Sequence, residues 1–323
     1  MKKIAVIGSG VVGEASGIGF MSKGNDVTFI DVSEKRVNEL KALGYKSYLS
    51  DEAINANLDI DINFFSVPTP TVNDHINLDF LKNAVSDFAK RLAKSNKYQV
   101  LVIRSTVLPG TTRSLITLIE EISGKRAGED FGICMNPEYL REISAYEDFV
   151  KPWIIVIGQY DEKSGQQLED LYQNFDAPIY KMNLEEAELQ KYIHNLYNAV
   201  KISFFNEFFQ IGKNMDMDTK KVMETVVKSS EGIWNHAYGT KDKGPYGRSC
   251  LPKDTKALST WAKEKGYETD VLNAAIDVNE KLLSKIAQDK NNFMEWANNN
   301  GLDKKTLTEI VGGNTKILES LSL

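Results

Sequence analysis

Short apolar runs alternate with amphipathic stretches through the first half of the chain. KKIAVIG (2–8) is rich in β-branched residues and stops at glycines, which predicts a buried strand. The same reasoning predicts strands at DVTFID (26–31), INFFSV (62–67), YQVLVIRST (98–106), FGICMN (131–136), WIIVIG (153–158) and PIYKM (178–182). Because helical patterns lie between several of these runs, we predict an α/β fold with a doubly wound, mostly parallel sheet covered by helices on both faces.

The pattern changes near residue 183, where helical periodicity replaces the strand-like runs. Upstream, Ser33 and Gly44 mark the predicted N-cap and C-cap of one short helix. Downstream, EEAELQKYIHNLYNAVKISFFNEFFQI contains neither Gly nor Pro for about seven helical turns. We therefore predict an α/β domain over 1–183 and, over 184–323, a long connecting helix followed by an all-helical substrate and dimerisation domain.

Composition and charge narrow the classes of function. The 323 residues carry a formal net charge of −6, which argues against a sequence-independent nucleic-acid binder. No apolar run reaches membrane-spanning length, and no secretory leader pattern opens the chain. The two cysteines, Cys134 and Cys250, are far apart and lack metal-ligand spacing. We expect a cytoplasmic protein with a small-molecule substrate, no metal site, no nucleic-acid partner and no membrane partner.

The first strand leads into a glycine-rich turn. Gly8, Gly10 and Gly13 form G-x-G-x-x-G directly before a helical pattern, and Asp31 ends the second predicted strand. Glycines allow the backbone to approach a pyrophosphate, whose charge is favoured at a helix N-terminus. The Asp31 carboxylate would accept from ribose hydroxyls and repel a 2′-phosphate, so a Rossmann-type domain that binds NAD rather than NADP is predicted.

Two polar loops follow later strands at their carboxyl ends, where ligands bind in open parallel sheets. They are SVPTP (66–70) and STVLPGTT (105–112), and their hydroxyls suit a phosphate or a nicotinamide amide. A plain turn at the end of a strand would look similar for either loop alone.

Paired polar residues appear in two further stretches. NPEYLRE (136–142) carries Glu138 and Glu142, which we predict to lie one helical turn apart after a strand. AELQKYIHN (187–195) carries Lys191 and Asn195 at i and i+4, on one face of the long helix. Taken alone, either pair fits an ordinary solvated helix face. His194 should point elsewhere, and we interpret it as structural.

GPYGRSCLPKD (244–254) places Cys250 in a loop of Gly, Pro and charged residues. A helix predicted to start near Lys253, together with the Lys253 charge, would favour the thiolate of Cys250. A buried packing role for Cys250 would leave its polar setting unexplained.

These motifs, in this order and spacing, resemble those of the UDP-glucose/GDP-mannose dehydrogenase family over residues 1 to about 290. Members of that family oxidise a CH2OH group of a nucleotide sugar, in pathways such as polysaccharide biosynthesis, to a carboxylate with two NAD per turnover. The resemblance implies that Cys250 is the nucleophile and that Lys191 and Asn195 stabilise oxyanions. It also implies an acid/base role for Glu142, and roles in water and proton transfer for the remaining polar residues of the motifs, namely Thr106, Glu138 and Asp254.

The resemblance also assigns binding residues. Those implied to contact NAD are Gly8, Gly10, Val11, Val12, Gly13, Asp31, Arg36, Val67, Pro68, Thr69, Ser105, Thr106 and Glu142. Those implied to contact the substrate are Tyr139, Leu140, Arg141, Lys191, Asn195, Tyr246, Gly247 and Arg248.

Two departures from the family pattern stand out. The cysteine loop of the family usually reads G-[FY]-G-G-x-C, whereas this chain has Pro245 and Arg248 in that loop. Pro245 removes flexibility and an N–H, and Arg248 is either a solvent-facing cation or a ligand for an anionic group of the substrate. The tail after residue 290 also shows no second set of strand–glycine–helix units. The chain is therefore either a natural short form without the C-terminal nucleotide-sugar domain, which we favour, or a piece cut from a longer protein.

Two other functions remain open at this level. A single-hydride 3-hydroxyacid-type dehydrogenase would use Lys191 and Asn195 with Cys250 as a bystander, and a non-catalytic NAD-binding protein would need none of the three. The aromatic residues Phe204, Phe205, Phe208 and Phe209 on the long helix are interpreted as core or as the interface of a homodimer.

Overall fold

The computed structural model describes residues 1–240, 244–247, 250–288, 290–302 and 307. The chain divides into two compact units, Met1–Asn195 and Leu196–Leu323, and the division falls inside one long helix, α8 (Leu184–Asn214). Residue 183, the predicted boundary, is the last residue of the strand that precedes α8.

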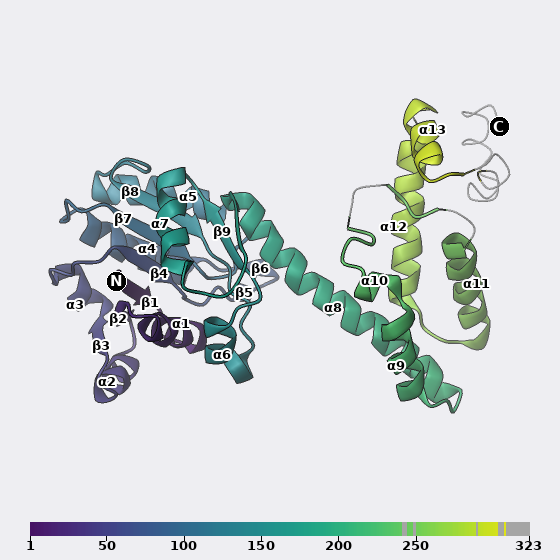
Figure 1. The fold of residues 1–323 in the computed structure, drawn as a ribbon, viewed down its shortest axis with the longest axis horizontal. Coiled ribbons are helices and arrows are strands. Elements are labelled where there is room, and N and C mark those ends of the chain that lie inside the picture. Colours follow the sequence, from purple (N-terminus) through teal and green to yellow (C-terminus); the bar gives the residue numbers. More distant parts are fainter. Residues whose placement is uncertain (241–243, 248–249, 289, 303–306, 308–323) are drawn as a thin grey trace. The chain divides into compact units, whose positions relative to one another are not determined.

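The first unit contains an eight-stranded sheet with the strand order β10-β9-β8-β7-β4-β1-β2-β3 (Figure 1). The strands from β3 across to β8 pair in parallel, β8 and β9 pair antiparallel, and β9 and β10 again pair in parallel. The order therefore reverses at β1, between β2 and β4. The strands are β1 (Lys3–Ile7), β2 (Asp26–Asp31), β3 (Lys46–Leu49), β4 (Ile62–Phe65), β7 (Gln99–Ile103), β8 (Phe131–Met135), β9 (Ile155–Gln159) and β10 (Ile179–Asn183).

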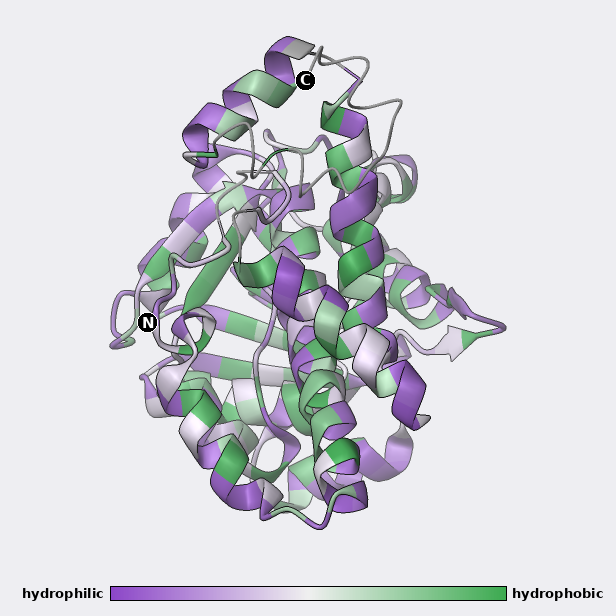
Figure 2. Ribbon diagram, turned by 90° about the vertical axis from the view of Figure 1, so that its right-hand side faces the viewer, coloured by the Kyte–Doolittle hydropathy of each residue, from purple (hydrophilic) through white to green (hydrophobic). Residues whose placement is uncertain are grey.

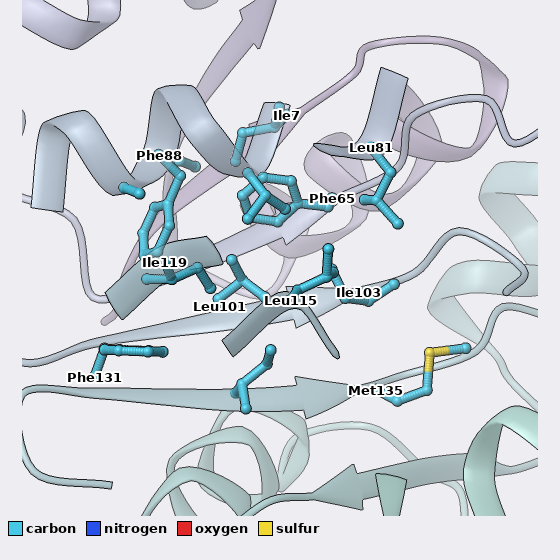
Figure 3. Close-up of a cluster of buried hydrophobic side chains, with 14 of the residues drawn as sticks. Ile7, Phe65, Leu81, Phe88, Leu101, Ile103, Leu115, Ile119, Phe131 and Met135 are labelled. Atoms are coloured by element: carbon cyan, nitrogen blue, oxygen red, sulfur yellow. The ribbon is translucent and has the colours of Figure 1, made fainter. Parts of the chain in front are cut away.

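Helices cover both faces of this sheet, as the doubly wound pattern predicts. One face packs against α3 (Ser50–Asn55), α4 (Asp79–Leu92) and α5 (Thr111–Ser123). Figure 3 shows Phe65, Leu101 and Ile103 of the sheet beside Phe88 of α4 and Ile119 of α5. Helices on the other face are α1 (Val11–Ser22), α2 (Glu34–Ala42), α6 (Ala145–Val150) and α7 (Glu162–Tyr172).

The alternation of apolar and polar residues along these helices explains the layers. In Figure 2, green and purple bands alternate along many of the helices, which is typical of helices with one apolar and one polar face. Fully buried side chains such as Phe20 and Phe64 contribute about 1.5–3 kcal/mol each by leaving water.

The second unit is helical in its described part. After the second half of α8 it contains α9 (Thr219–Ser229), α10 (Glu231–Trp234), α11 (Cys250–Lys265), α12 (Asp270–Ile286) and α13 (Lys290–Asn299). Its small core joins Leu283 of α12 to Phe293 and Trp296 of α13, with Leu307.

The sequence patterns did not predict the edge strand β3, helix α3, or the hairpin of β5 (Thr71–Val72) and β6 (His75–Ile76). Asn73 and Asp74 turn this hairpin with positive φ. Among the described residues, no helix combines the length and the apolar character needed to cross a membrane.

Candidate active site

The glycine-rich turn lies at the carboxyl end of β1, where the strand order reverses. Gly8 has φ +85°, which disfavours any residue with a Cβ. A Cβ on Gly13 would lie 1.9 Å from the Gly8 oxygen, so only glycine lets α1 approach the strand this closely. A Cβ on Gly10 would meet nothing within 4 Å, which leaves the N-terminus of α1 open to a phosphate.

Asp31 and Arg36 both hold this turn. The Asp31 carboxylate accepts hydrogen bonds from the Ser9 N–H (2.7 Å) and the Ser33 N–H (2.9 Å). The Arg36 Nε donates to the Ser9 oxygen (2.8 Å), and its Nη2 lies 2.6 Å from the Glu14 carboxylate. Two predicted NAD contacts thus shape the loop itself.

The turn and its neighbours fit NAD in their chemistry. Among the described residues, the buried hydroxyls of Ser9 and Ser66, at the ends of β1 and β4, have no hydrogen-bond partner. Val11 and Val12 open α1, with Val11 exposed, so the first turn presents backbone N–H groups beside these hydroxyls.

The loops after β4 and β7 are joined to each other. The Ser105 hydroxyl donates to the Val67 oxygen (2.6 Å), and the Thr69 hydroxyl donates to the Thr106 oxygen (2.8 Å). These bonds place both loops, with Pro68 on the outside, at the edge of the sheet that carries the glycine turn. The loops 66–70 and 105–112, which the sequence analysis predicted to bind ligand, therefore form one surface.

Lys191 and Glu138 are brought together from α8 and from the loop after β8. The Lys191 Nζ donates to the Glu138 main-chain oxygen and lies 3.1 Å from its Oε1. Lys191 is only 5% exposed. Since burying an ammonium group is favourable only when it is paired, the Glu138 contacts fix the amine in one place.

The prediction that Glu138 and Glu142 lie one helical turn apart is wrong. Residues 136–141 form no helix, and Glu142 begins a 3-10 turn, η1 (Glu142–Ser144). Pro137 has no N–H, the Leu140 N–H turns back to the Glu138 carboxylate (2.6 Å), and the Arg141 N–H donates to Asp148 (2.9 Å). These bonds hold the backbone out of helical geometry. Glu142 is exposed.

Arg141, a predicted substrate contact, forms an ion pair with the buried carboxylate of Asp148. Its Nη2 lies 2.7 Å from Asp148 Oδ1, and its Nε also donates to Asp148. The hydrogen bonds from Arg141 hold the pKa of Asp148 well below its usual range. The pair ties the loop that carries Glu138 to α6.

Tyr139 packs on the same face of α8 as Lys191. Its hydroxyl donates to Gln190 Oε1, its ring centroid lies 4.9 Å from that of His194, and the Lys191 Nζ lies 5.2 Å from the ring centroid. Burial raises the pKa of the Tyr139 hydroxyl, so it remains a neutral donor. Burial and the Lys191 charge lower the pKa of His194, which favours the neutral imidazole near pH 7. Leu140 is half-buried and packs against the core on the other face of the sheet. Asn195 lies exposed one turn beyond Lys191 on α8.

Glu188 is a residue that the sequence analysis missed. It is fully buried, and its carboxylate accepts hydrogen bonds from the Gly110 N–H and from the Thr112 N–H (2.7 Å) at the start of α5. The N-cap residue of α5 is Gly110, which has no side chain to cap the helix, so α8 supplies the cap. Burial raises the pKa of Glu188. The signal was its position three residues before Lys191, on the same helix face.

Cys250 and Asp254 lie in the second unit, at i and i+4 in the first turns of α11. The helix begins at Cys250, not near Lys253 as predicted, because Pro252 falls in the first turn, where its missing N–H has no helical acceptor to lose. Cys250 is exposed, and the Lys253 Nζ lies 2.8 Å from Asp254 Oδ1. Arg248 lies outside the described residues.

Cys134, in contrast, is buried in β8, and burial raises its pKa to about 12, which suits a packing role. Tyr246 and Gly247 are half-buried in the loop that precedes Cys250. No cluster of metal-binding side chains occurs in the part of the chain that the structure describes.

Family models match most of the chain. The NAD-binding domain of the UDP-glucose/GDP-mannose dehydrogenase family matches residues 2–49 and 46–176, and the central domain of that family matches residues 185–281.

Individual proteins agree with these matches. The GDP-mannose 6-dehydrogenase of Pseudomonas syringae is 33% identical over 300 residues, which is 86% of this chain and 68% of the relative. A UDP-glucose 6-dehydrogenase of Bacillus subtilis is 36% identical over 87% of this chain and 63% of the relative. A ternary complex of GDP-mannose dehydrogenase from Pseudomonas aeruginosa superposes with TM-score 0.85 and 27% identity, covering 100% of this chain and 87% of the other. The chain is therefore an NAD-dependent dehydrogenase that belongs to the UDP-glucose/GDP-mannose dehydrogenase family.

Proposed function

We propose that this enzyme oxidises the primary alcohol of a nucleotide sugar to a carboxylate in two successive hydride transfers, with Cys250 as the covalent nucleophile. The relatives named above act on GDP-mannose and UDP-glucose, which supports this class of substrate. Bound at the glycine turn, NAD supplies the acceptor for each hydride.

In the first transfer the alcohol carbon loses a hydride and its hydroxyl loses a proton, which gives an aldehyde. Lys191 donates to the substrate oxygen, since its Nζ is already held by Glu138 and has donor capacity left. Glu142 takes the proton, directly or through water; it is exposed and makes none of the side-chain hydrogen bonds or ion pairs found among the described residues.

In the second transfer the Cys250 thiolate adds to the aldehyde carbon, and the carbonyl electrons move to the oxygen. Lys191 and Asn195 stabilise the oxyanion that develops. The oxyanion of this thiohemiacetal then loses a hydride and its carbonyl bond re-forms, which gives a thioester. A water molecule, activated by Glu142 and arranged by Thr106, Glu138 and Asp254, attacks this thioester. Its C–S bond breaks, the thiolate of Cys250 is restored, and the carboxylate product is released.

The observation that carries this proposal is the buried Lys191 amine, held by Glu138 at the edge of the sheet that bears the glycine turn. A cation kept in one place before substrate arrives has little to reorganise when charge develops.

NADH yield tests the proposal. UDP-glucose and GDP-mannose are supplied in limiting amounts, and two NADH per sugar are expected from the wild type. Cys250→Ser should stop after one NADH and release an aldehyde, because a hydroxyl is a far weaker nucleophile than a thiolate. Cys134→Ser is the matched control and should still give two. A Cys250→Ser enzyme that forms the carboxylate at the wild-type rate contradicts the covalent step; one NADH per sugar from the wild type favours the single-hydride alternative, and NAD binding without turnover favours a non-catalytic protein.

We also propose that the enzyme is a homodimer formed through α8. The residues Leu196, Tyr197, Val200 and Ile202 are 55–62% exposed along this helix. In the second unit, Phe204 and Phe208 open onto an apolar groove of about 370 Å³ that Val222 and Trp261 also line. Apolar patches of this kind usually mark interfaces. Sedimentation should give a dimer for the wild type and a monomer for Val200→Asp; a wild-type monomer at micromolar concentration overturns the proposal.

A further inference from the structure

The loop that leads to Cys250 is held from one side by an asparagine of α12. The Tyr246 N–H donates to Asn279 Oδ1 (2.7 Å), and Asn279 Nδ2 donates back to the Tyr246 oxygen (3.1 Å). Asn279 is 9% exposed. One side chain thus satisfies both backbone groups of a residue four positions before the candidate nucleophile, which fixes the local direction of the chain.

A tryptophan of α13 holds the same loop from a second side. The Trp296 Nε1 donates to the Pro245 oxygen (3.1 Å), and Trp296 is 6% exposed. A Cβ on Gly244 would lie 3.0 Å from the indole Cδ1, and a Cβ on Gly247 would lie 3.1 Å from the indole Cζ2. The two glycines therefore let the loop backbone lie against the indole ring. Gly244 also has φ +74°, where a side chain would be strained.

These contacts are tied to what is unusual in this chain. Pro245 restricts the backbone of the loop and has no N–H. Its main-chain oxygen nevertheless accepts a hydrogen bond from Trp296. That tryptophan belongs to α13, beyond residue 281, where the match to the family's central domain ends. Trp296 is itself anchored by Phe293 and Leu283 in the core of the second unit. The support for the loop thus comes from a helix beyond the residues that the central-domain model matches.

The clamped loop also bounds a hollow beside the start of α11. This hollow of about 700 Å³ is lined by Tyr246, Gly247 and Asn279, together with Tyr238, Leu251 and Asn300. Leu251 directly follows Cys250, so a shift of the loop would move the wall of the hollow and the nucleophile together.

We propose that Asn279 and Trp296 are positioning residues for Cys250: they hold residues 244–247 so that the thiol meets the aldehyde in the second half of the reaction. This inference rests on the proposed function. Covalent attack requires the reacting atoms to be held in a narrow geometry, whereas the first hydride transfer does not involve the thiol. Loss of the clamp should therefore slow the second oxidation selectively.

Two variants and one control test this. Asn279→Ala removes both hydrogen bonds to Tyr246, and Trp296→Phe keeps a ring but removes the donor to Pro245. Asn273→Ala is the matched control, because Asn273 also lies on α12 and accepts a hydrogen bond from Ser259 of α11, away from the loop. Hydrogen exchange of the Tyr246 and Gly247 amides, and NADH yield with limiting UDP-glucose or GDP-mannose, are measured for each.

We expect the Tyr246 amide to exchange about tenfold faster in Asn279→Ala, as the loss of a buried hydrogen bond predicts. NADH per sugar should fall from two towards one in both clamp variants, with an aldehyde that hydroxylamine traps. The rate of the first transfer should stay within about twofold, and Asn273→Ala should match the wild type in every measurement.

The outcomes separate this inference from the proposed function. If Cys250→Ser yields one NADH while both clamp variants still yield two, the positioning role is overturned and the covalent mechanism stands. If the clamp variants slow both transfers equally, the residues are structural and the inference fails. If neither sugar is oxidised by the wild type, the proposed substrate class fails, and the exchange data alone then decide the clamp: unchanged exchange rejects it, and faster exchange supports it.

Discussion

In the first unit the candidate catalytic cation is buried and paired, whereas in the second unit the candidate nucleophile lies exposed at the start of a helix. Lys191 is 5% exposed and contacts Glu138 twice. Cys250 is exposed and follows a loop that Asn279 and Trp296 hold through neutral hydrogen bonds. The first unit therefore holds its candidate cation through a buried ion pair. The second unit holds the loop before its candidate nucleophile through hydrogen bonds to the loop backbone.

The long helix α8 supplies a cap to one helix in each unit. Glu188 accepts hydrogen bonds from the first backbone N–H groups of α5, and Glu207 accepts them from Val271 and Leu272 at the start of α12. Neither helix has a side-chain cap of its own. Glu188 is fully buried and Glu207 only partly, so the same device should be worth more in the first unit.

The largest expected effect comes from breaking the buried pair. Lys191→Met keeps most of the volume but removes the charge that would stabilise the oxyanion, so kcat should fall about 10²–10³-fold. Because Lys191 is not among the residues predicted to contact NAD, the dissociation constant of NAD should change by no more than about twofold. Stopped-flow absorbance of NADH and equilibrium binding of NAD measure the two quantities.

Lys213→Met provides the control, since Lys213 is an exposed lysine near the end of the same helix. It should leave both quantities unchanged. A Lys191→Met enzyme that keeps its kcat and loses only affinity for substrate would show that Lys191 binds without stabilising the transition state.

The two helix caps provide the next largest effect. Glu188→Ala leaves two buried N–H groups without an acceptor and should lower the local stability of α5 by about 2–4 kcal/mol. Glu207→Ala should cost α12 about 1 kcal/mol, as for an ordinary lost cap. Native-state hydrogen exchange of the α5 and α12 amides gives each value separately.

The control for the caps is Glu185→Ala, which removes a surface ion pair with Arg113 next to Glu188. Its effect should be below about 0.5 kcal/mol, because water screens exposed charges. Equal losses for Glu188→Ala and Glu207→Ala would remove the contrast between the two units.

Sequence reasoning performed best where a feature depends on local pattern alone. The apolar runs predicted β1, β2, β4 and β7, and the Ser33 cap of α2 is confirmed by its bond to the Arg36 N–H. The helical prediction for Glu138 and Glu142 failed because Asp148, seven positions after Arg141, accepts the Arg141 N–H and opens the turn.

Residues that act through long-range contacts gave at most a weak signal, such as the spacing of Glu188 from Lys191. Glu188 looked like any glutamate on a helix surface, and its role depends on Gly110, which lies 78 positions away. Asn279 and Trp296 likewise contact the cysteine loop only through the packing of α12 and α13. Short edge elements such as β3 were missed because Ser47 is the one residue of that strand that is buried.

The smallest expected effect concerns how the first unit holds its Glu138 loop, and it depends on pH. Asp148→Asn weakens the bonds from Arg141 and should lower the free energy of unfolding by about 0.5–1 kcal/mol at pH 7, because the Arg141 side chain is largely exposed. The pKa of Asp148 is lowered in the folded state by the hydrogen bonds from Arg141, so its stabilisation is present above the usual aspartate pKa and is lost as pH falls through the folded value. The difference between wild type and Asp148→Asn should therefore shrink steadily from about pH 5 downward. Urea unfolding from pH 7 to pH 3, with Glu147→Gln as the exposed control beside it, measures this, and a difference that grows towards low pH would mean that Asp148 is protonated in the native enzyme and that the first unit does not use this charge to hold the loop.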